Sequence, residues 1–463
     1  MDKKRHILLL NPPGKKSYLR DYYCSHTSKA RYYYYPYDLF VQSGILGENH
    51  YVDGMDANVL HWSSEKTLTD MELREFDAIL FLTGAVSWKE DFEFIEKVIK
   101  EYPLSIAATG DILLTQGKEI MEKTPWLDAV LMDFTSESLG EFWQGKYKGE
   151  QVNNLIYRHN DEIIDGGRSL EKGEYSHPLP RYELFPYHKY RVPYGVYHPY
   201  AETLTDYGCP FHCTFCFSGE LGYRTRNLDN WLREVQYYRS LNIKELRFKD
   251  LTFGCRRKHH MEVCDIMLSE NLGMSWSCLS RVDVLNEEIL EKMAASGCHT
   301  IQLGVENADS GILKTVKKGI TREKTFEVFS LCRQYNIRTL AHFIIGLPGE
   351  TRESAMETLE LAKELDPYIA SFNLAMPRIG SKLREEALTD GKITKEDDTF
   401  DNSKGKPVIE IDGLSKEELW KVKNEVIRKF YLRPGFFNHF LEGIRSPGEL
   451  LNAVFEGLAL FRS

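Results

Sequence analysis

The sequence lacks any run of about 18 apolar residues, the length that a helix needs to cross a bilayer, so we expect no membrane span. It also lacks an excess of positive charge. The formal net charge is -10 at pH 7, which argues against a large surface for nucleic acid. The apolar run that follows His6 is shorter than the hydrophobic core of a signal peptide, so we expect no leader.

A disulfide-like spacing of cysteines is absent too. The nine cysteines are an odd number spread over 463 residues, a pattern typical of the reducing cytoplasm. No internal repeat or low-complexity tract interrupts the chain. A chain of this length exceeds one ordinary core, and its 42% hydrophobic residues are enough to fill several. We therefore predict a cytoplasmic protein built from several units.

Three cysteines do stand close together. Cys209, Cys213 and Cys216 have the spacing C-x3-C-x2-C in a stretch that begins and ends with glycine. Iron–sulfur clusters are normally held by four thiolates, so three leave one iron of a 4Fe–4S cluster open to a substrate or cofactor. The alternative is structural zinc, which usually has four Cys or His ligands, and the sequence has no second C-x2-C pair. The cysteines interpreted as buried structural thiols are Cys255, Cys264, Cys278, Cys298 and Cys332.

The first 150 residues alternate apolar runs with helical patterns. Continuous apolar strands between helices predict a parallel sheet covered on both faces, a doubly wound Rossmann-like domain. The strands are expected at residues 6–11, 50–53, 77–82, 105–109 and 129–132. Ligands of such sheets bind at the carboxyl ends of the strands. The residues at these ends are Asn11, Pro12, Thr83, Gly84, Thr109, Gly110 and Asp133.

A second alternation of strands and helices follows the cysteine stretch. Its six strand–helix units predict a partial (β/α)6 barrel, in which polar residues at the carboxyl ends of strands are functional. The strands are expected at residues 203–207, 244–248, 275–278, 300–305, 338–345 and 370–375. The residues at or beyond their ends include Asp250, Arg281, Glu306, Gly346, Gly349 and Met376.

The cysteine spacing, the aromatic Phe215 before the last cysteine and the order of these strand ends resemble the radical S-adenosylmethionine (SAM) superfamily. The resemblance implies a 4Fe–4S cluster on Cys209, Cys213 and Cys216 whose open iron binds SAM. It implies SAM contacts by Asp250, Arg281, Glu306, Gly346, Gly349 and Met376. The chain departs from the family at Lys249, where an aspartate is usual, and in the degraded motif around Met376.

The first 150 residues look like the cobalamin-binding domain that precedes the barrel in many radical SAM methyltransferases. The resemblance implies cobalamin contacts by the seven strand-end residues from Asn11 to Asp133. There is no D-x-H-x-x-G motif, so no histidine is expected below the cobalt. Glycines that the family has near Thr109 and Asp133 are missing, and glycine allows close backbone approach to a ligand. The alternative is a sheet domain that has lost cobalamin.

The predicted domain boundaries follow from changes in amino-acid composition along the chain. Prolines punctuate a Tyr-rich stretch at residues 151–200, which we interpret as a linker between the domains at 1–150 and 201–385. Residues 386–463 form a small, mostly helical C-terminal region, in which Ser415 and Glu418 are expected to make a capping box. This tail resembles cobalamin-type radical SAM proteins that act on hopanoids and chlorophyll precursors.

The resemblance implies an enzyme that cleaves SAM reductively and, with cobalamin, methylates an unactivated carbon of a small molecule. It implies an electron donor such as flavodoxin or ferredoxin as partner, and no nucleic acid. The alternative within the family is a radical rearrangement, cyclisation or C–C bond formation without methyl transfer. A non-enzymatic electron carrier would need neither a barrel nor Asp250, Glu306 and Gly346.

Overall fold

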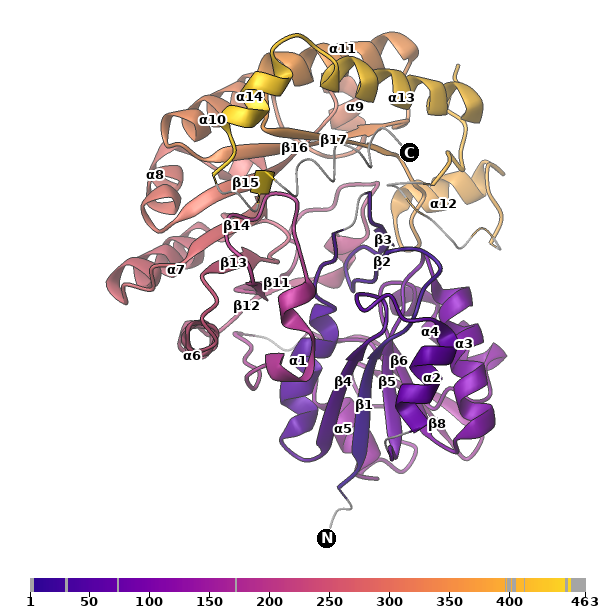
Figure 1. Ribbon diagram of the computed structural model, residues 1–463. Coiled ribbons are helices and arrows are strands. Elements are labelled where there is room, and N and C mark those ends of the chain that lie inside the picture. The colour runs from indigo at the N-terminus through magenta and orange to yellow at the C-terminus, as the bar shows by residue number, and fades with distance from the viewer. Residues whose placement is uncertain are drawn as a thin grey trace. The chain divides into compact units, whose positions relative to one another are not determined.

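The computed structural model describes residues 4–29, 32–72, 75–170, 173–395, 397, 401, 405–411, 413–445 and 449–450. The chain folds into two compact units, Met1–Val192 and Pro193–Ser463 (Figure 1). No helix in the described residues has both the length and the apolar character needed to cross a membrane.

The first unit is built on a seven-stranded sheet with the strand order β4-β1-β5-β6-β7-β8-β9. The strands are β1 (His6–Asn11), β4 (Tyr51–Asp56), β5 (Ala78–Leu82), β6 (Ser105–Thr109), β7 (Ala129–Leu131), β8 (Leu155–His159) and β9 (Glu162–Asp165). The first five in spatial order are parallel, as predicted, and β8 and β9 add an antiparallel hairpin. This hairpin lies in the stretch that the sequence interprets as a linker.

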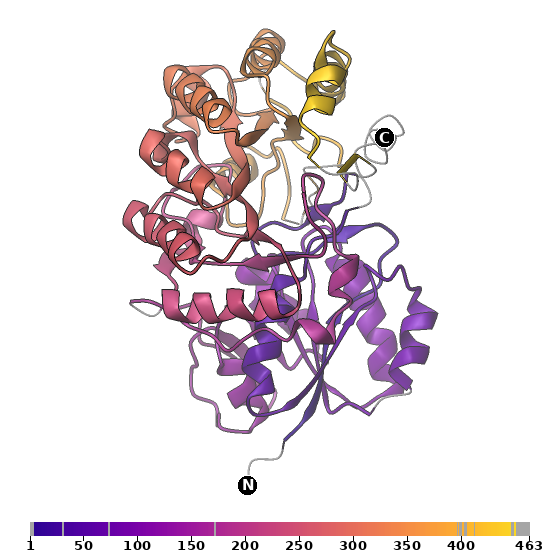
Figure 2. The same cartoon turned by 60° about the vertical axis from the view of Figure 1, so that its left-hand side comes forward.

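Helices cover both faces of this sheet, which explains why residues 7–10 of β1 and the whole of β5 are apolar. The helices are α1 (Tyr37–Gly47), α2 (Ser64–Glu72), α3 (Trp88–Glu101), α4 (Leu113–Lys123) and α5 (Ser138–Trp143). Figure 2 shows α1 on one side of the sheet and α3 with α4 on the other. In α3 the residues Phe92, Ile95 and Val98 recur every third position and are buried, while the opposite face is charged.

The stretch before the second unit is packed, not extended. This stretch contains two short 3-10 helices, η1 (Tyr182–Leu184) and η2 (Tyr187–Lys189). It packs on the segment that follows β2 (Tyr18–Leu19) and β3 (His26–Thr27), two short strands that pair with each other near the start of the chain. The ring of Tyr35 lies 4.3 Å from that of Tyr190 and 5.3 Å from that of Tyr182. Tyr35, Tyr182 and Tyr190 are buried and therefore belong to the core of the first unit.

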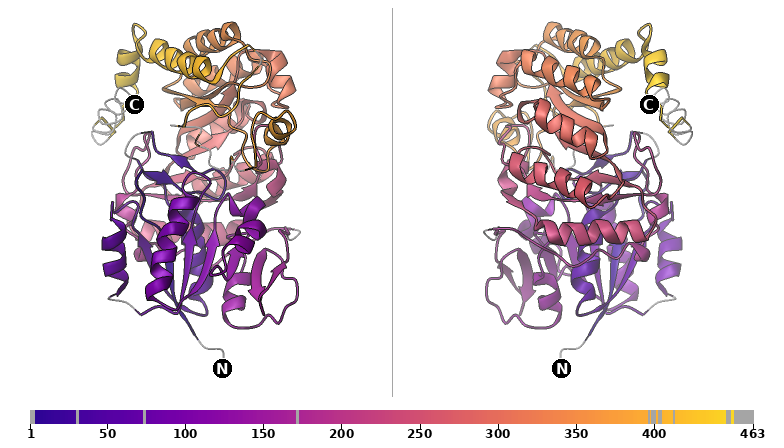
Figure 3. Two further views of the ribbon diagram at one scale, coloured as in Figure 1. Left: turned by 90° about the vertical axis from the view of Figure 1, so that its right-hand side faces the viewer. Right: turned by 90° about the vertical axis from the view of Figure 1, so that its left-hand side faces the viewer.

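The second unit contains a six-stranded, all-parallel sheet with the order β10-β13-β14-β15-β16-β17. Its strands are β10 (Tyr200–Thr203), β13 (Glu245–Phe248), β14 (Ser275–Ser280), β15 (Cys298–Glu306), β16 (Arg338–Ile345) and β17 (Ile369–Leu374). Its helices are α6 (Leu228–Ser240), α7 (Arg257–Ser269), α8 (Glu287–Ala295), α9 (Ser310–Thr315), α10 (Arg322–Gln334) and α11 (Arg352–Leu365). Figure 3 shows the helices as an outer layer over these strands, the predicted partial barrel.

The bounds of the first barrel strand differ from the prediction, which placed this strand at residues 203–207. In the structure β10 ends at Thr203, and β11 (Asp206–Gly208) leaves the sheet to pair antiparallel with β12 (Tyr223–Thr225). The break is caused by a contact distant in sequence, because the backbone N–H groups of Thr205 and Asp206 donate to the Asp250 carboxylate instead of to a neighbouring strand.

The C-terminal region contributes α12 (Lys382–Thr389), α13 (Lys416–Tyr431) and α14 (Phe436–Glu442). The predicted capping box of Ser415 and Glu418 opens α13, with both reciprocal hydrogen bonds formed. The buried face of α13 packs on α11 and β17, so this helix belongs to the barrel unit. Residues 451–463, which the sequence assigns to the same region, lie outside the described residues.

Candidate functional site

The cysteine loop joins β11 to η3 (Ser218–Leu221) and is anchored at several points. Gly208 has a φ of +79°, and a Cβ there would lie 1.9 Å from the Gly222 carbonyl, so only glycine fits. The Thr214 N–H donates to the Val316 carbonyl at 3.1 Å, and the Thr214 carbonyl accepts from the Leu383 N–H at 2.9 Å. The backbone of the loop is therefore fixed without help from a ligand.

Phe215, the aromatic residue before the last cysteine, adds an apolar anchor. It packs against a buried cluster that includes Val316, Leu347, Ala375 and Leu383. These residues come from the segments after α9, β16 and β17 and from α12. The aromatic position thus ties the cysteine loop to the carboxyl ends of the last barrel strands.

Polar groups converge on all three sulfurs. The Arg281 guanidinium donates to Cys213 Sγ at 3.3 Å, the Ser218 N–H donates to Cys216 Sγ at 3.4 Å, and the Thr252 hydroxyl lies 3.7 Å from Cys209 Sγ. Burial raises the pKa of the Cys213 thiol, and the cations of Lys318 and Arg281 act against that rise. Burial also raises the pKa of Cys209, and the other two thiols add to the rise.

This donor set fits an iron–sulfur cluster better than zinc. Sulfur ligands of one tetrahedral zinc, about 2.3 Å from the metal, lie about 3.8 Å apart. Among the described residues, only one group places three ligand atoms within 4.8 Å of one another, and Cys209, Cys213 and Cys216 are not in it. His212 is exposed and faces Glu220 at 3.7 Å, so it does not complete a zinc site. The three sulfurs suit a larger cluster with nearby N–H donors.

Arg281 stands beside the cysteine loop at the end of β14, as the sequence predicts. Its guanidinium donates from Nε and Nη2 to the two oxygens of Asp283, from Nη2 also to the Lys318 carbonyl, and from Nη1 to Cys213 Sγ. The same group lies 3.9 Å from the centroid of the Phe211 ring. Because arginine has five N–H donors and four are engaged, one remains for a ligand.

Glu306 ends β15 with a φ of +65°, a conformation that non-glycine residues adopt rarely and mostly at functional sites. Its Oε1 accepts from Lys318 Nζ at 2.7 Å in a buried ion pair. A Cβ at Gly304 would lie 2.4 Å from that oxygen and 2.6 Å from the lysine nitrogen. The glycine therefore makes room for the ion pair. Lys318 and Arg281 both approach Cys213, so the structure brings Cys213, Arg281 and Glu306 together.

The loop after β16 is tied to the loop after β15 by Glu350. Its carboxylate accepts from Asn307 Nδ2 at 2.5 Å and from the Gly346 N–H. Burial raises the pKa of Glu350 to about 7, although both contacts favour the charged form. Gly346 and Gly349 have φ values of +94° and +85°, so both need glycine. Glu350 thus holds Gly346 next to the residue that follows Glu306.

Met376 lies just beyond β17 and is buried with Leu374 against Ile379, Val408 and Trp420. It forms part of an apolar wall at the same edge of the sheet. Gly349 borders a pocket of about 90 Å³ that Leu383 and Ile409 also line.

Asp250 is placed differently from Glu306. It is fully buried, with Oδ1 accepting from the N–H groups of Thr205 and Asp206 at 2.7 and 3.0 Å. Its Oδ2 accepts from the Thr205 hydroxyl at 2.6 Å. Burial and the neighbouring Asp206 raise the pKa of Asp250 to about 7. Both oxygens therefore support the turn that leads into the cysteine loop.

The predicted cobalamin edge of the first unit is organised by one buried cation. The Arg20 guanidinium donates to Asn11 Oδ1 at 2.9 Å, to the Pro12 carbonyl at 3.0 Å and to Asp91 Oδ1 at 2.5 Å. Asp91 Oδ2 also accepts from the Thr83 hydroxyl at 2.8 Å. Neither Arg20 nor Asp91 has any exposed side-chain surface. The loops after β1 and β5 are thus held together by side chains.

The other predicted residues of this edge are also engaged within the protein. A Cβ at Gly110 would lie 1.9 Å from the Thr83 carbonyl, and one at Gly84 would lie 2.5 Å from the Ser25 Cβ. The Thr109 hydroxyl donates to the Leu131 carbonyl, and Asp133 accepts from the N–H and hydroxyl of Thr135. A cobalamin at this edge would therefore be held mainly by backbone groups. The loop after β1 also borders a cavity of about 440 Å³ lined by Pro13, Lys15, His61, Trp62 and Phe94.

Sequence reasoning missed Lys318 and Glu350. Glu350 follows Gly349 directly, so its place after a strand end was a usable signal. Lys318 belongs to a Lys-Lys-Gly run that reads as a solvated turn, and only the fold after α9 returns it to Glu306.

Comparison with known proteins agrees with this geometry. Residues 205–362 match the family model of the radical SAM superfamily. The chain is 29% identical over 416 residues to an uncharacterized methyltransferase of Pyrococcus horikoshii, covering 86% of this chain and 88% of the relative. It is 24% identical over 414 residues to the anaerobic magnesium-protoporphyrin IX monomethyl ester cyclase of Cereibacter sphaeroides, covering 84% of this chain and 65% of that protein.

The fold is shared with a solved structure. The radical SAM methyltransferase TsrM from Kitasatospora setae, with cobalamin and a [4Fe–4S] cluster bound, superposes with a TM-score of 0.66. The match covers 84% of this chain and 78% of that one at 16% identity. The likeness confirms the predicted fold class, in which a parallel-sheet domain precedes a radical SAM barrel.

Proposed function

We propose that this chain, which belongs to the radical SAM superfamily, cleaves SAM reductively and methylates an unactivated carbon of a small molecule. The observation that carries the proposal is the convergence of the cysteine loop, Arg281 and the Glu306–Lys318 pair at the carboxyl ends of the barrel strands. A [4Fe–4S] cluster on Cys209, Cys213 and Cys216 supplies the electron for SAM cleavage, and cobalamin supplies the methyl group.

The chain's own residues bind and orient SAM in this scheme. The remaining N–H of Arg281 is a donor for the SAM carboxylate, on a side chain that its contacts with Asp283 and Phe211 hold still. Glu306 is an acceptor for donor groups of SAM, and the ion pair with Lys318 holds its carboxylate in place. Gly346 and Gly349 allow the backbone to approach the adenosine, and Met376 provides an apolar wall.

Asp250 supports SAM binding indirectly in this proposal. Its two oxygens fix the turn at Thr205 and Asp206, and Asp206 lies three residues before Cys209, the first cluster cysteine. The residue is a positioning residue for the cysteine loop, since its side chain is fully buried and both of its oxygens accept hydrogen bonds from the turn.

Cobalamin is assigned to the carboxyl edge of the first sheet, near Asn11, Pro12, Thr83, Gly84, Thr109, Gly110 and Asp133. What supports the assignment is the parallel sheet and the cavity beside Pro13. The electron donor is expected to be a small reduced protein such as flavodoxin or ferredoxin. The nine cysteines, an odd number without a disulfide-like spacing, suit a reducing compartment, the cytoplasm.

Anaerobic purification tests the first half of the proposal. The reconstituted wild-type chain should contain about four irons and four sulfides, and it should form 5′-deoxyadenosine from SAM and a reductant. Replacing Cys209, Cys213 and Cys216 with alanine should abolish both, whereas Cys332→Ala, a buried thiol elsewhere in the unit, should change neither. Retention of the cluster absorbance by the triple variant would refute the cluster assignment.

A second candidate is a radical rearrangement or cyclisation without methyl transfer. It is favoured by the internal engagement of the edge residues, such as Thr83 with Asp91 and Asp133 with Thr135. Equilibrium dialysis with hydroxocobalamin separates the two candidates. Methylation requires about one retained cobalt per chain. If the reconstituted protein retains none but still cleaves SAM, the second candidate replaces the first.

A further inference from the structure

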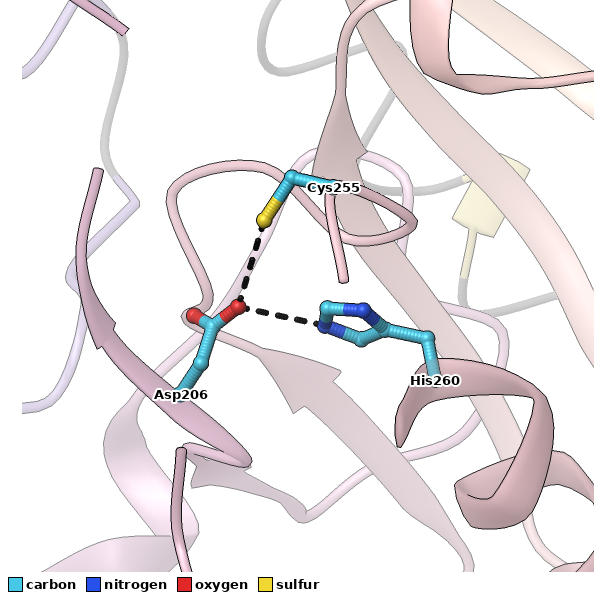
Figure 4. A group of neighbouring side chains, drawn as sticks. All are labelled: Asp206, Cys255 and His260. Carbon is cyan, nitrogen blue, oxygen red and sulfur yellow. Dashed lines mark hydrogen bonds and ion pairs between the residues drawn. The ribbon is translucent and has the colours of Figure 1, made fainter. Parts of the chain in front are cut away.

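A second group of metal-ligand side chains lies in the barrel unit, apart from the cluster cysteines. Asp206 on β11, Cys255 before α7 and His260 within α7 place one ligand atom each within 4.8 Å of the others. Figure 4 shows the three side chains pointing toward one another. Cys255 Sγ lies 3.7 Å from Asp206 Oδ2, and His260 Nε2 lies 3.2 Å from the same oxygen.

The tautomer of His260 is fixed by the helix. Its Nδ1 lies 3.1 Å from the Arg256 carbonyl, which accepts a hydrogen bond and therefore keeps the proton on Nδ1. In the neutral ring, Nε2 then presents a lone pair to the Asp206 carboxylate. The contact at 3.2 Å lacks hydrogen-bond geometry, and Nε2 has no hydrogen-bond partner in the described residues. A backbone carbonyl on the distal nitrogen is the usual support for a metal-binding histidine.

The carboxylate of Asp206 is also incompletely satisfied. Its Oδ2 accepts from the Tyr223 hydroxyl at 2.9 Å and from the Cys255 thiol, whereas Oδ1 is buried without a partner in the described part of the chain. The side chain is 1% exposed. A buried carboxylate oxygen and an imidazole lone pair facing each other are costly unless a cation or a proton lies between them.

We propose that Asp206, Cys255 and His260 bind a divalent transition metal, with zinc as the best-matched ion. In tetrahedral zinc sites the nitrogen and oxygen ligands lie about 3.3 Å apart, and sulfur and oxygen ligands about 3.6 Å apart. The distances of 3.2 and 3.7 Å around Asp206 Oδ2 match this geometry. Cys255 is half-buried, whereas Asp206 and His260 are buried. The Tyr223 hydroxyl and the Arg256 carbonyl orient two of the ligands.

The site has a defined place in the fold. Asp206 lies on the short strand that leads into Cys209, whereas Cys255 precedes α7 and His260 lies in the first turn of that helix. A metal here would fasten the entrance of the cysteine loop to that helix. It would use none of the three cysteines assigned to the cluster, so this inference stands whether or not cobalamin is bound.

The first test uses the whole enzyme. Anaerobically purified protein grown with zinc should contain about one zinc per chain, and zinc-edge X-ray absorption should show about one sulfur at 2.3 Å with nitrogen and oxygen neighbours. The iron of the cluster does not contribute at the zinc edge. Absence of zinc, or a zinc shell without sulfur, would overturn the proposal, the second outcome showing adventitious surface binding.

The second test assigns the ligands. Cobalt(II) added to the Cys209→Ala, Cys213→Ala, Cys216→Ala variant should give a thiolate-to-cobalt absorption band and raise the unfolding temperature. Cys255→Ser should remove the band, and His260→Gln should weaken cobalt binding by at least tenfold. Cys264→Ser changes a cysteine of α7 that lies outside the proposed ligand set and should leave binding intact. Equal binding by Cys255→Ser, His260→Gln and Cys264→Ser would overturn the assignment, and circular dichroism shows whether each is folded.

Discussion

Gly304→Ala is expected to displace the carboxylate of Glu306 while the fold around it stays the same. The added Cβ would lie 2.4 Å from Glu306 Oε1 and 2.6 Å from Lys318 Nζ. Ordinary contact begins at 3.4 Å, so the two atoms must retreat by 3.4 − 2.4 = 1.0 Å and 3.4 − 2.6 = 0.8 Å. Both are the ends of side chains, and Gly304 does not have a positive φ, so the backbone of β15 can accept alanine.

The expected magnitude follows from what the displaced carboxylate does. A hydrogen bond to a charged group contributes about 1.5–3 kcal/mol, so losing one SAM contact should weaken SAM binding by about tenfold to hundredfold. The ion pair is shifted rather than broken. The free energy of unfolding should therefore fall by much less than the roughly 3–5 kcal/mol lost when one partner of a buried pair is removed.

SAM affinity is measured anaerobically by calorimetry on the cluster-loaded protein, together with iron content and 5′-deoxyadenosine formation. Iron should stay constant while affinity falls, and Glu306→Gln should reproduce the loss. Gly140→Ala is the matched control, because its Cβ would meet only the Leu46 side chain at an ordinary 3.4 Å. Unchanged SAM affinity in both Gly304→Ala and Glu306→Gln would refute a contact between Glu306 and SAM.

Two further predictions concern buried charges of the barrel unit. Burial lowers the pKa of Lys423 from 10.5 to about 8, and at pH 7 the charged lysine costs about 3 kcal/mol of stability. Lys423→Met should recover up to about 3 kcal/mol below pH 8, and the gain in stability should vanish as the pH rises toward 10.5. Urea unfolding of wild type and variant at pH 7 and pH 10 checks this. Equal gains in stability at the two pH values would contradict it. Asp250→Asn should lower stability by about 1–3 kcal/mol by disturbing three accepted hydrogen bonds, with only a small loss of SAM affinity. A large loss of affinity at unchanged stability would instead assign Asp250 to direct SAM contact.

The strands were predictable because burial leaves a local signature. Residues 78–82 and 338–345 are apolar runs of strand length between helical patterns, and they form β5 and β16. The order of the strand ends in the sequence was then enough to place Cys213, Arg281 and Glu306 at one edge of the barrel, where the structure has them. Ends of parallel strands meet at one edge whatever the sequence distance between them.

Contacts that depend on long-range packing left no such signature. Cys255 reads as a structural thiol because its spacing matches no motif, yet it lies beside Asp206, 49 positions earlier in the chain. The end of β10 was misplaced for a related reason. Residues 203–207 look like one strand, and only Asp250, 45 positions away from Thr205, draws the backbone out of the sheet.

A comparable long-range contact lies in the first unit, where the sequence pointed to Asn11 and Thr83 but not to the Arg20 cation between them. Arg20→Met leaves the Asp91 carboxylate buried without its cation, although the Thr83 and Ser87 hydroxyls still donate to it.

Removing one partner of a buried ion pair costs roughly 3–5 kcal/mol, whereas replacing both partners by apolar residues is often neutral. Arg20→Met should therefore destabilise the chain by about that amount in urea unfolding, and Arg20→Met with Asp91→Leu should recover part of it. Cobalt retained after dialysis should fall with Arg20→Met, because the loops after β1 and β5 lose their common tie, while the iron on the cysteine loop should not change. If the double variant is as unstable as the single one, the hydrogen bonds of Arg20 to the Asn11 side chain and the Pro12 carbonyl hold this edge together, and its ion pair with Asp91 does not.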